Sequence, residues 1–258
     1  MDGLQMGVLV LVFVYGAIIG SFLNVCIYRI PANESIIKGR SHCMSCRYQL
    51  AWRDLIPLFS WLAFRGRCRK CGGKISVQYP LVEALNGAAY VVIFSIIGFD
   101  GTQPLILSVL YSLMASALLA LSIIDWRTYE IPLGFNIWIG ILGVIHLVVD
   151  SEHWHDYVIG FFAVSACIQV IVWVSKGRAI GGGDAKLMAA AGLLLGWKLI
   201  ILAFAVGCIL GSVIHITRMK VSGADHMLAM GPYLAMGIII AALWGDALIQ
   251  AYLNIVFG

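Results

Sequence analysis

The chain has 258 residues, of which 61% are hydrophobic and 12% are charged, and its formal net charge is +4. A soluble domain is typically about 45–50% apolar and about 25% charged, so the composition excludes an ordinary soluble protein. It indicates an all-α protein that crosses a membrane several times.

Basic residues gather in one part of the chain. Residues 29–74 hold ten of the seventeen lysines and arginines, whereas acidic residues dominate 150–156. Such an asymmetry sets the orientation of a membrane protein, because cytoplasmic loops are rich in Lys and Arg. Since this bias already explains the basic segment, we expect the lipid bilayer and no nucleic acid as its partner.

Apolar runs predict about eight transmembrane helices. The runs lie at 6–27, 81–98, 105–124, 132–149, 157–175, 187–196, 198–217 and 228–249. The run at 187–196 is too short to cross a bilayer alone. We therefore expect it to start earlier, to run short, or to lie half inside the helical bundle.

The first two runs are separated by residues 28–80, the only sizeable polar segment. It contains two C-x2-C pairs, Cys43 with Cys46 and Cys68 with Cys71, separated by twenty-one residues. Two such pairs suit tetrahedral zinc, because each short turn offers two thiolates to one ion. Four thiolates leave no open position on the metal, so this zinc is predicted to be structural. Two disulfides, which a reducing cytoplasm disfavours, and a redox pair are the alternatives.

Alternation of the eight runs predicts the orientation. If the cysteine module is cytoplasmic, sixteen of the seventeen basic residues fall on the cytoplasmic side, and Lys198 is the exception. The same alternation places Asp125 and Asp184 at that membrane face.

These two aspartates are the candidate catalytic pair. Asp184 lies in the segment GGGDAK at 181–186, just before the run at 187–196, and Asp125 follows the run at 105–124. An acid at membrane depth is costly and is therefore a functional candidate. Two carboxyl groups at close range share one proton, so that one can activate water while the other polarises a carbonyl. The glycines before Asp184 permit close approach of an extended substrate strand.

Each of these residues also has a plainer interpretation. Asp184 stands where aspartate commonly caps a helix, a role that is compatible with catalysis, and Asp125 stands at an interfacial helix end. Lys186 is expected to extend toward the interface, and neutralisation of a carboxylate is the alternative. Glu130 is a rival acid to Asp125, but it lies in a polar loop where we expect it to be solvated.

Over nearly its whole length the sequence resembles the type IV prepilin peptidases, which are membrane aspartic proteases of the GxGD type. The resemblance covers GSFLNVCIYRIP at 20–31, the double C-x2-C module, ISVQYPLVE at 75–83, IDWRTYEIP at 124–132, GGGDAKL at 181–187 and MGPYLAMG at 230–237. The departures are small. Met44 stands where Pro is common, Leu133 where Asp is frequent, and Met230 where Phe is usual. None of them removes an aspartate or a cysteine of the motifs.

The resemblance implies an aspartic endopeptidase of the inner membrane, with Asp125 and Asp184 as its catalytic pair. Its substrates would be prepilins or pseudopilins of type IV pilus or type II secretion systems. A short basic leader would be cleaved after Gly at the cytoplasmic face. Many members then N-methylate the new terminus with S-adenosylmethionine, an activity associated with the cysteine module. We therefore expect a bifunctional enzyme, although no methyl-donor motif is readable.

These inferences divide the chain into three parts. They are a first transmembrane helix at 1–27, a cytoplasmic four-cysteine zinc module at 28–80, and a transmembrane peptidase bundle at 81–258. Two other classes of function stay open. A transporter would use Asp125 and Asp184 as a proton relay, and an assembly scaffold would dock partners through the cysteine module. The sequence does not indicate an oligomeric state.

Overall fold

The computed structural model describes residues 3–176, 180–222 and 228–257, and the regular elements in these ranges are all helices. Arg178, one of the basic residues that the alternation places on the cytoplasmic side, lies outside the described residues, as do residues 1–2 of the first predicted part. The chain divides into two compact units, Met1–Ala120 and Leu121–Gly258. Each unit is described by itself.

Six helical segments in the described ranges are long and apolar enough to cross a membrane. They are Gly3–Arg29, Gln78–Ile97, Thr102–Thr128, Ser151–Ser175, Trp197–Val221 and Gly231–Val256. Two shorter helices, Leu133–Val149 and Gly182–Leu195, coincide with the two remaining predicted runs. The all-α membrane fold is therefore confirmed, and the predicted number of eight spans is approximate.

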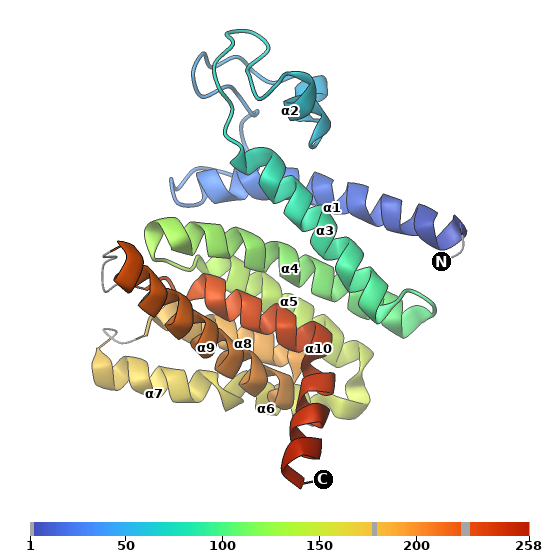
Figure 1. The fold of residues 1–258 in the computed structure, drawn as a ribbon, viewed down its shortest axis with the longest axis vertical. Helices are drawn as coiled ribbons and strands as arrows, with labels where there is room; N and C mark the ends of the chain where they lie inside the picture. Colours follow the sequence, from blue (N-terminus) through green and yellow to red (C-terminus); the bar gives the residue numbers. More distant parts are fainter. Residues whose placement is uncertain (1–2, 177–179, 223–227, 258) are drawn as a thin grey trace. The chain divides into compact units, whose positions relative to one another are not determined.

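In the first unit, α1 (Gly3–Arg29) packs closely on α3 (Gln78–Ile97) (Figure 1). A Cβ atom added to Gly16 would lie 2.8 Å from the Gly87 Cα atom, so glycine permits this contact. Such small-residue contacts are typical of helices that associate in lipid. The buried Asn86 amide donates to the Gly16 carbonyl at 2.7 Å and accepts from Ser116 of α4 (Thr102–Thr128) at 2.9 Å.

The polar segment between α1 and α3 contains η1 (Trp52–Leu55) and α2 (Phe59–Ala63). Arg29, at the end of α1, donates to the carbonyl oxygens of Ser35 and Lys38 at 2.9 and 3.0 Å. The buried Glu83 of α3 accepts a hydrogen bond from the Leu58 N–H at 2.8 Å. These contacts attach the polar segment to the two helices that flank it.

The second unit contains the end of α4 and seven further helices. They are α5 (Leu133–Val149), η2 (Ser151–His153), α6 (Trp154–Ala163), α7 (Ser165–Ser175), α8 (Gly182–Leu195), α9 (Trp197–Ser222) and α10 (Gly231–Phe257). The short helix α8 is central, because α5, α6, α7, α9 and α10 all contact it (Figure 1). Leu187, Met188 and Leu194 of α8 are fully buried. A helix enclosed on all sides does not have to span the bilayer to be stable.

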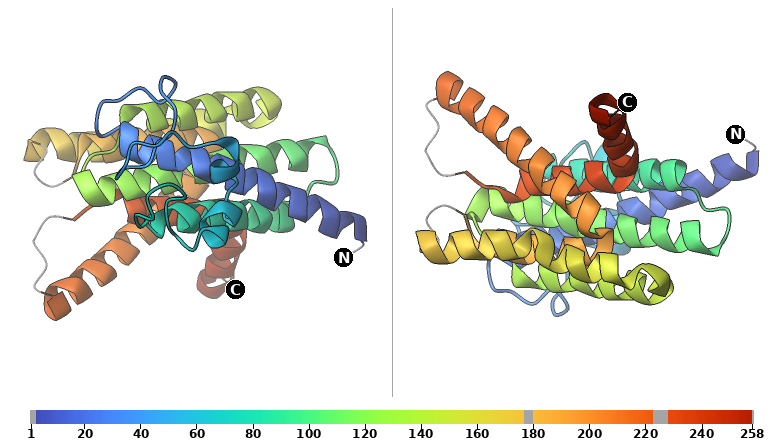
Figure 2. Two further views of the ribbon diagram at one scale, coloured as in Figure 1. Left: turned by 90° about the horizontal axis from the view of Figure 1, so that it is seen from above. Right: turned by 90° about the horizontal axis from the view of Figure 1, so that it is seen from below.

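The predicted run at 157–175 is interrupted. Helix α6 ends at Ala163 and α7 begins at Ser165, whose hydroxyl group donates to the Phe161 carbonyl oxygen. Serine bonds of this kind to the preceding turn bend helices. Helix α9 is long, and its second half extends away from the rest of the second unit, where Val213 and Ile216 are exposed (Figure 2).

Candidate functional site

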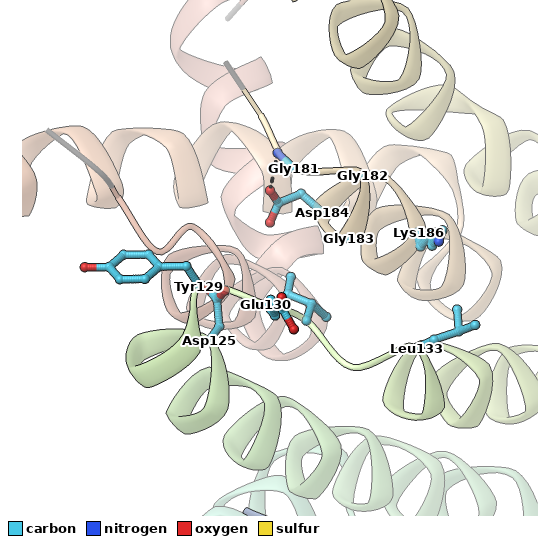
Figure 3. A pocket seen from close by; sticks show the side chains of 10 residues that line it. Asp125, Tyr129, Glu130, Leu133, Gly181, Gly182, Gly183, Asp184 and Lys186 are labelled. Carbon is cyan, nitrogen blue, oxygen red and sulfur yellow. Dashed lines mark hydrogen bonds between the residues drawn. The ribbon is translucent and has the colours of Figure 1, made fainter. Parts of the chain in front are cut away.

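A polar pocket of about 300 Å³ lies within the second unit (Figure 3). Its walls come from the end of α4, the α4–α5 loop and the beginning of α8. The lining residues are Asp125, Tyr129, Glu130, Ile131, Leu133, Gly181, Gly182, Gly183, Asp184 and Lys186. Both aspartates that the sequence singles out therefore contribute to one cavity, although they lie 59 positions apart in the chain.

Asp184 lies in the first turn of α8 and is only 7% exposed. Its Oδ2 atom accepts a hydrogen bond from the Gly181 N–H at 3.1 Å, shown as a dashed line in Figure 3. The Asp184 N–H in turn donates to the Gly181 carbonyl oxygen at 3.1 Å. Asp184 thus caps α8 from its third position instead of the N-cap position, and capping leaves its second carboxylate oxygen free of that role.

Asp125 lies in the last turn of α4 and is only 4% exposed. Its Oδ2 atom accepts a hydrogen bond from the Gly231 N–H at 2.8 Å, at the beginning of α10. The first N–H groups of a helix have no partner within the helix, so a carboxylate is well placed there. The backbone of α10 therefore holds Asp125 from a distant part of the chain.

The two carboxyl groups interact electrostatically across the pocket. Each of them also lies at the N-terminal end of a helix, Asp184 in α8 and Asp125 beside α10. Helix N-termini favour negative charge, which offsets part of the cost of burying two acids together. Two carboxyl groups that line one largely buried pocket cannot both be ionised without a cost in free energy.

The three glycines before Asp184 differ in their surroundings. A Cβ atom on Gly183 would lie 3.0 Å from the Ile131 Cβ atom, so this glycine permits the loop after α4 to approach α8. A Cβ atom on Gly182 would meet nothing within 4 Å, although Gly182 lines the pocket. The backbone at Gly182 is therefore open to a ligand in the pocket.

The two charged neighbours are exposed. Lys186 lines the pocket, but its side chain points away from Asp184 (Figure 3), and no ion pair joins it to either aspartate among the described residues. This agrees with the expectation that Lys186 extends outward. Glu130 is also exposed, whereas Asp125 is buried, so Glu130 is the acid with access to solvent.

Gly231 is a further residue of the site that the sequence does not predict. A Cβ atom at this position would lie 2.7 Å from the Asp125 Oδ2 atom, so only glycine leaves room for the carboxylate at its present position. The segment MGPYLAMG at 230–237 signals a motif, and Gly followed by Pro suggests the beginning of a helix. Nothing in that segment indicates which residue its first N–H group binds.

In the first unit, the four predicted cysteines form one cluster. Their sulfur atoms all lie within 4.8 Å of one another, with Cys43 3.9 Å from Cys71 and Cys46 4.0 Å from Cys68. Four sulfur atoms at about 2.3 Å from a tetrahedral zinc ion are about 3.8 Å apart. The cluster could hold a metal ion, and its donor set fits zinc.

The backbone builds this cluster from two equivalent turns. The Cys43 N–H donates to the Tyr48 carbonyl oxygen and the Cys68 N–H donates to the Gly73 carbonyl oxygen, a shift of 25 residues in both cases. Each turn is closed by a short antiparallel bridge, His42 with Gln49 and Arg67 with Lys74. In the first turn, backbone N–H groups point at the sulfur atom of Cys43. Those of Cys46 and Ser45 lower the pKa of the Cys43 thiol to about 6, which favours its thiolate. The Gly73 N–H lowers the pKa of the Cys71 thiol, but hydrogen bonds with the other three cysteines raise it to about 11, so the N–H groups favour the thiolate at Cys43 only.

The fold and the pocket together define a polytopic membrane protein with a buried pair of carboxyl groups, the arrangement of a membrane aspartic peptidase. Two family profiles match the chain. The Bacterial Peptidase A24 N-terminal domain matches residues 14–97, and the Type IV leader peptidase family matches residues 112–216.

Curated relatives are similar over most of the chain. Three examples, each named "Prepilin leader peptidase/N-methyltransferase", come from different bacteria. The relative from Bacillus subtilis is 30% identical over 96% of this chain and 99% of its own length. The relative from Stutzerimonas stutzeri is 32% identical over 93% of this chain and 92% of its own length. The relative from Myxococcus xanthus is 35% identical over 83% of this chain and 64% of its own length. No solved structure shows a significant match.

The chain belongs to the type IV leader peptidase family. It is accordingly an enzyme, and the resemblance that its motifs suggest is confirmed.

Proposed function

We propose that this protein cleaves the short basic leader of prepilins or pseudopilins after Gly, with Asp125 and Asp184 as its catalytic pair. The observation that supports this most is the presence of two carboxyl groups, both more than nine-tenths buried, on the wall of one pocket. The names of the relatives supply the substrate class.

In this mechanism one aspartate is ionised and the other is protonated. The ionised carboxylate removes a proton from a water molecule, whose oxygen attacks the carbonyl carbon of the scissile Gly. The protonated carboxyl group donates its proton to the carbonyl oxygen. When the tetrahedral intermediate collapses, the C–N bond breaks and a proton passes to the leaving amine. The products are a leader with a new carboxyl terminus and a pilin with a new amino terminus.

The substrate lies extended across the beginning of α8. The backbone at Gly182 is open to the pocket and carries no side chain that would block a strand. Gly183 cannot play the same part, because it packs against Ile131. The leader is expected to approach from the cytoplasmic side, because its basic residues are attracted to anionic headgroups. The aspartates and the cysteine module then lie on the cytoplasmic side of the inner membrane.

The domain division follows from this assignment. Residues 1–27 form the first transmembrane helix, 28–80 a zinc module, and 81–258 the peptidase bundle. In the module, Cys43, Cys46, Cys68 and Cys71 would hold a structural zinc ion, whose four thiolate ligands leave it no open position. The methyl transfer, with S-adenosylmethionine as donor, rests on the names of the relatives.

Replacement of either aspartate by asparagine tests the pair. Asn has nearly the same shape as Asp but cannot exchange a proton, so D125N and D184N should each abolish cleavage of a prepilin in detergent or liposomes. Asp246→Asn is the matched control, because Asp246 is exposed on α10 and does not line the pocket. Wild-type cleavage by a well-expressed D125N or D184N protein would rule out the paired mechanism. Proton-coupled flux without cleavage in the wild-type protein would favour a transporter instead.

A further inference from the structure

Asn136, one turn into α5, is a buried amide for which the described part of the chain supplies no hydrogen-bond partner. Its side chain is 4% exposed, and neither its Nδ2 nor its Oδ1 atom has a hydrogen-bond partner among the described residues. An amide offers two donors and an acceptor that in water would all be satisfied. Inside an apolar bundle, each unpaired group destabilises the fold, so buried polar side chains without partners are rare.

The position of Asn136 relates it to the aspartate pocket. Asn136 belongs to the buried stripe of α5 that continues with Ile139, Leu142 and Gly143. Leu133, three residues earlier and therefore on nearly the same side of the helix, lines the pocket. The polar group thus lies one helical turn deeper in the bundle than the pocket wall.

Contacts with α8 occur both before and after Asn136 in the sequence. Before it, Ile131 lies against Gly183, where an added Cβ atom would be 3.0 Å from the Ile131 Cβ atom. After it, Gly143 lies against Leu193 at the same close range, because an added Cβ atom would be 3.0 Å from the Leu193 Cβ atom. Ile131 lies just before α5, and Gly140, one turn after Asn136, also approaches α8, because an added Cβ atom would lie 4.0 Å from the Ala190 Cβ atom. Asn136 therefore belongs to the side of α5 that faces α8.

We propose that Asn136, one helical turn beyond Leu133 of the pocket wall, binds a water molecule from which the water consumed in each cleavage is replaced. Buried water typically makes about three hydrogen bonds to polar groups that lack other partners, and the amide supplies two kinds of bond. Peptide hydrolysis consumes one water per bond cleaved, and a site at the edge of an apolar bundle needs a place to hold it. The inference rests on the proposed peptidase function.

The chemistry favours water over a second metal or a charged ligand. The amide is neutral, and a neutral group attracts neither a cation nor an anion strongly. The other buried residues of its stripe on α5 are aliphatic or glycine, so α5 itself supplies no counter-ion for a charged ligand there. A small neutral molecule that both donates and accepts hydrogen bonds fits such a place.

Asn136→Leu tests the proposal, because it keeps the size of the side chain and removes its polar atoms. The substitution removes the amide and its bound water together, and replacing both hydrogen-bond partners by apolar atoms of similar shape is nearly neutral, so the thermal midpoint should change by less than roughly 2–4 °C. The kcat for prepilin cleavage should nevertheless fall about 100-fold, because the water is no longer held, while KM stays unchanged. The kcat of the Asn136→Ser enzyme, whose side chain keeps one polar atom, should lie between those of the wild-type and N136L enzymes.

Asn254→Leu is the matched control, because Asn254 is exposed on α10 and the chemical change is identical. It should change neither kcat nor KM. Wild-type kcat in a folded N136L enzyme would overturn the proposal, as would a rise in KM at unchanged kcat, which would mean that the amide binds the substrate itself. If N136L does not fold, the comparison is made with N136S, and wild-type kcat there would overturn the proposal equally. Failure of the wild-type protein to cleave any prepilin would instead refute the proposed function.

Discussion

Replacement of Gly231 by alanine should impair activity more than stability. The added Cβ atom would lie 2.7 Å from the Asp125 Oδ2 atom and 3.1 Å from its Cγ atom. To reach ordinary van der Waals contact, the carboxylate oxygen has to move by roughly 0.7 Å. Gly231 does not have a positive φ, so alanine can adopt its backbone conformation. The side chain that has to yield is therefore the candidate catalytic one.

The magnitude follows from the bond that is lost. The Gly231 N–H donates to the carboxylate at 2.8 Å, and a hydrogen bond to a charged group contributes about 1.5–3 kcal/mol. If the transition state loses that much stabilisation, kcat/KM falls by about 10- to 150-fold. The same loss, offset by the better helix propensity of alanine, which is worth about 1 kcal/mol, should lower the free energy of unfolding by about 0.5–2 kcal/mol.

The assay compares prepilin cleavage and thermal unfolding for G231A and for Gly134→Ala. Gly134 is the second residue of α5, and a Cβ atom there would meet nothing within 4 Å, so the control adds the same methyl group near the beginning of a helix. The control should cleave like the wild-type enzyme. Wild-type kcat/KM in G231A would refute the view that the beginning of α10 holds Asp125 in its working position.

Two further outcomes follow from the geometry. Elemental analysis should find one zinc ion per chain, lost in Cys43→Ser or Cys68→Ser but kept in Cys167→Ser, whose cysteine is exposed outside the cluster; metal-free wild-type protein with four freely alkylated thiols in the module would contradict this. Gly182→Ala should raise KM without changing the thermal midpoint, because its Cβ atom meets only the open pocket, whereas Gly183→Ala should also lose stability against Ile131. Equal effects of the two changes on stability would refute the difference assigned to the two glycines.

Those parts of the fold that depend on local patterns could be predicted from the sequence. Apolar runs identified the helices, and the spacing of Cys43, Cys46, Cys68 and Cys71 predicted four sulfur atoms close enough to share one ion. Alternation of the runs placed Asp125 and Asp184 at one membrane face, and the structure brings them to one pocket. Their catalytic role stays a prediction until the asparagine variants are assayed.

Contacts between distant segments could not be predicted. The bond from Gly231 to Asp125 joins residues 106 positions apart, and no local pattern reports it. Asn136 was hidden because it lies in an apolar run, 132–149, whose average character does not reveal which face a single amide occupies. The break between α6 and α7 depends on one Ser165 hydroxyl group that turns back to the Phe161 carbonyl oxygen, a choice that the sequence leaves open.

The two carboxyl groups differ in how they are held, and this difference shows what the pocket depends on. Asp184 is bound by an N–H group three residues away, so α8 alone fixes it. Asp125 is bound by the beginning of α10, so its position depends on whatever fixes α10. That helix packs against α9 through glycines. A Cβ atom on Gly207 of α9 would lie 3.1 Å from the Leu234 Cα atom, and Gly237 of α10 allows a similarly close approach to Ala203. The close packing of α9 on α10, which begins within one helical turn of Gly231, therefore helps to fix the position of Asp125.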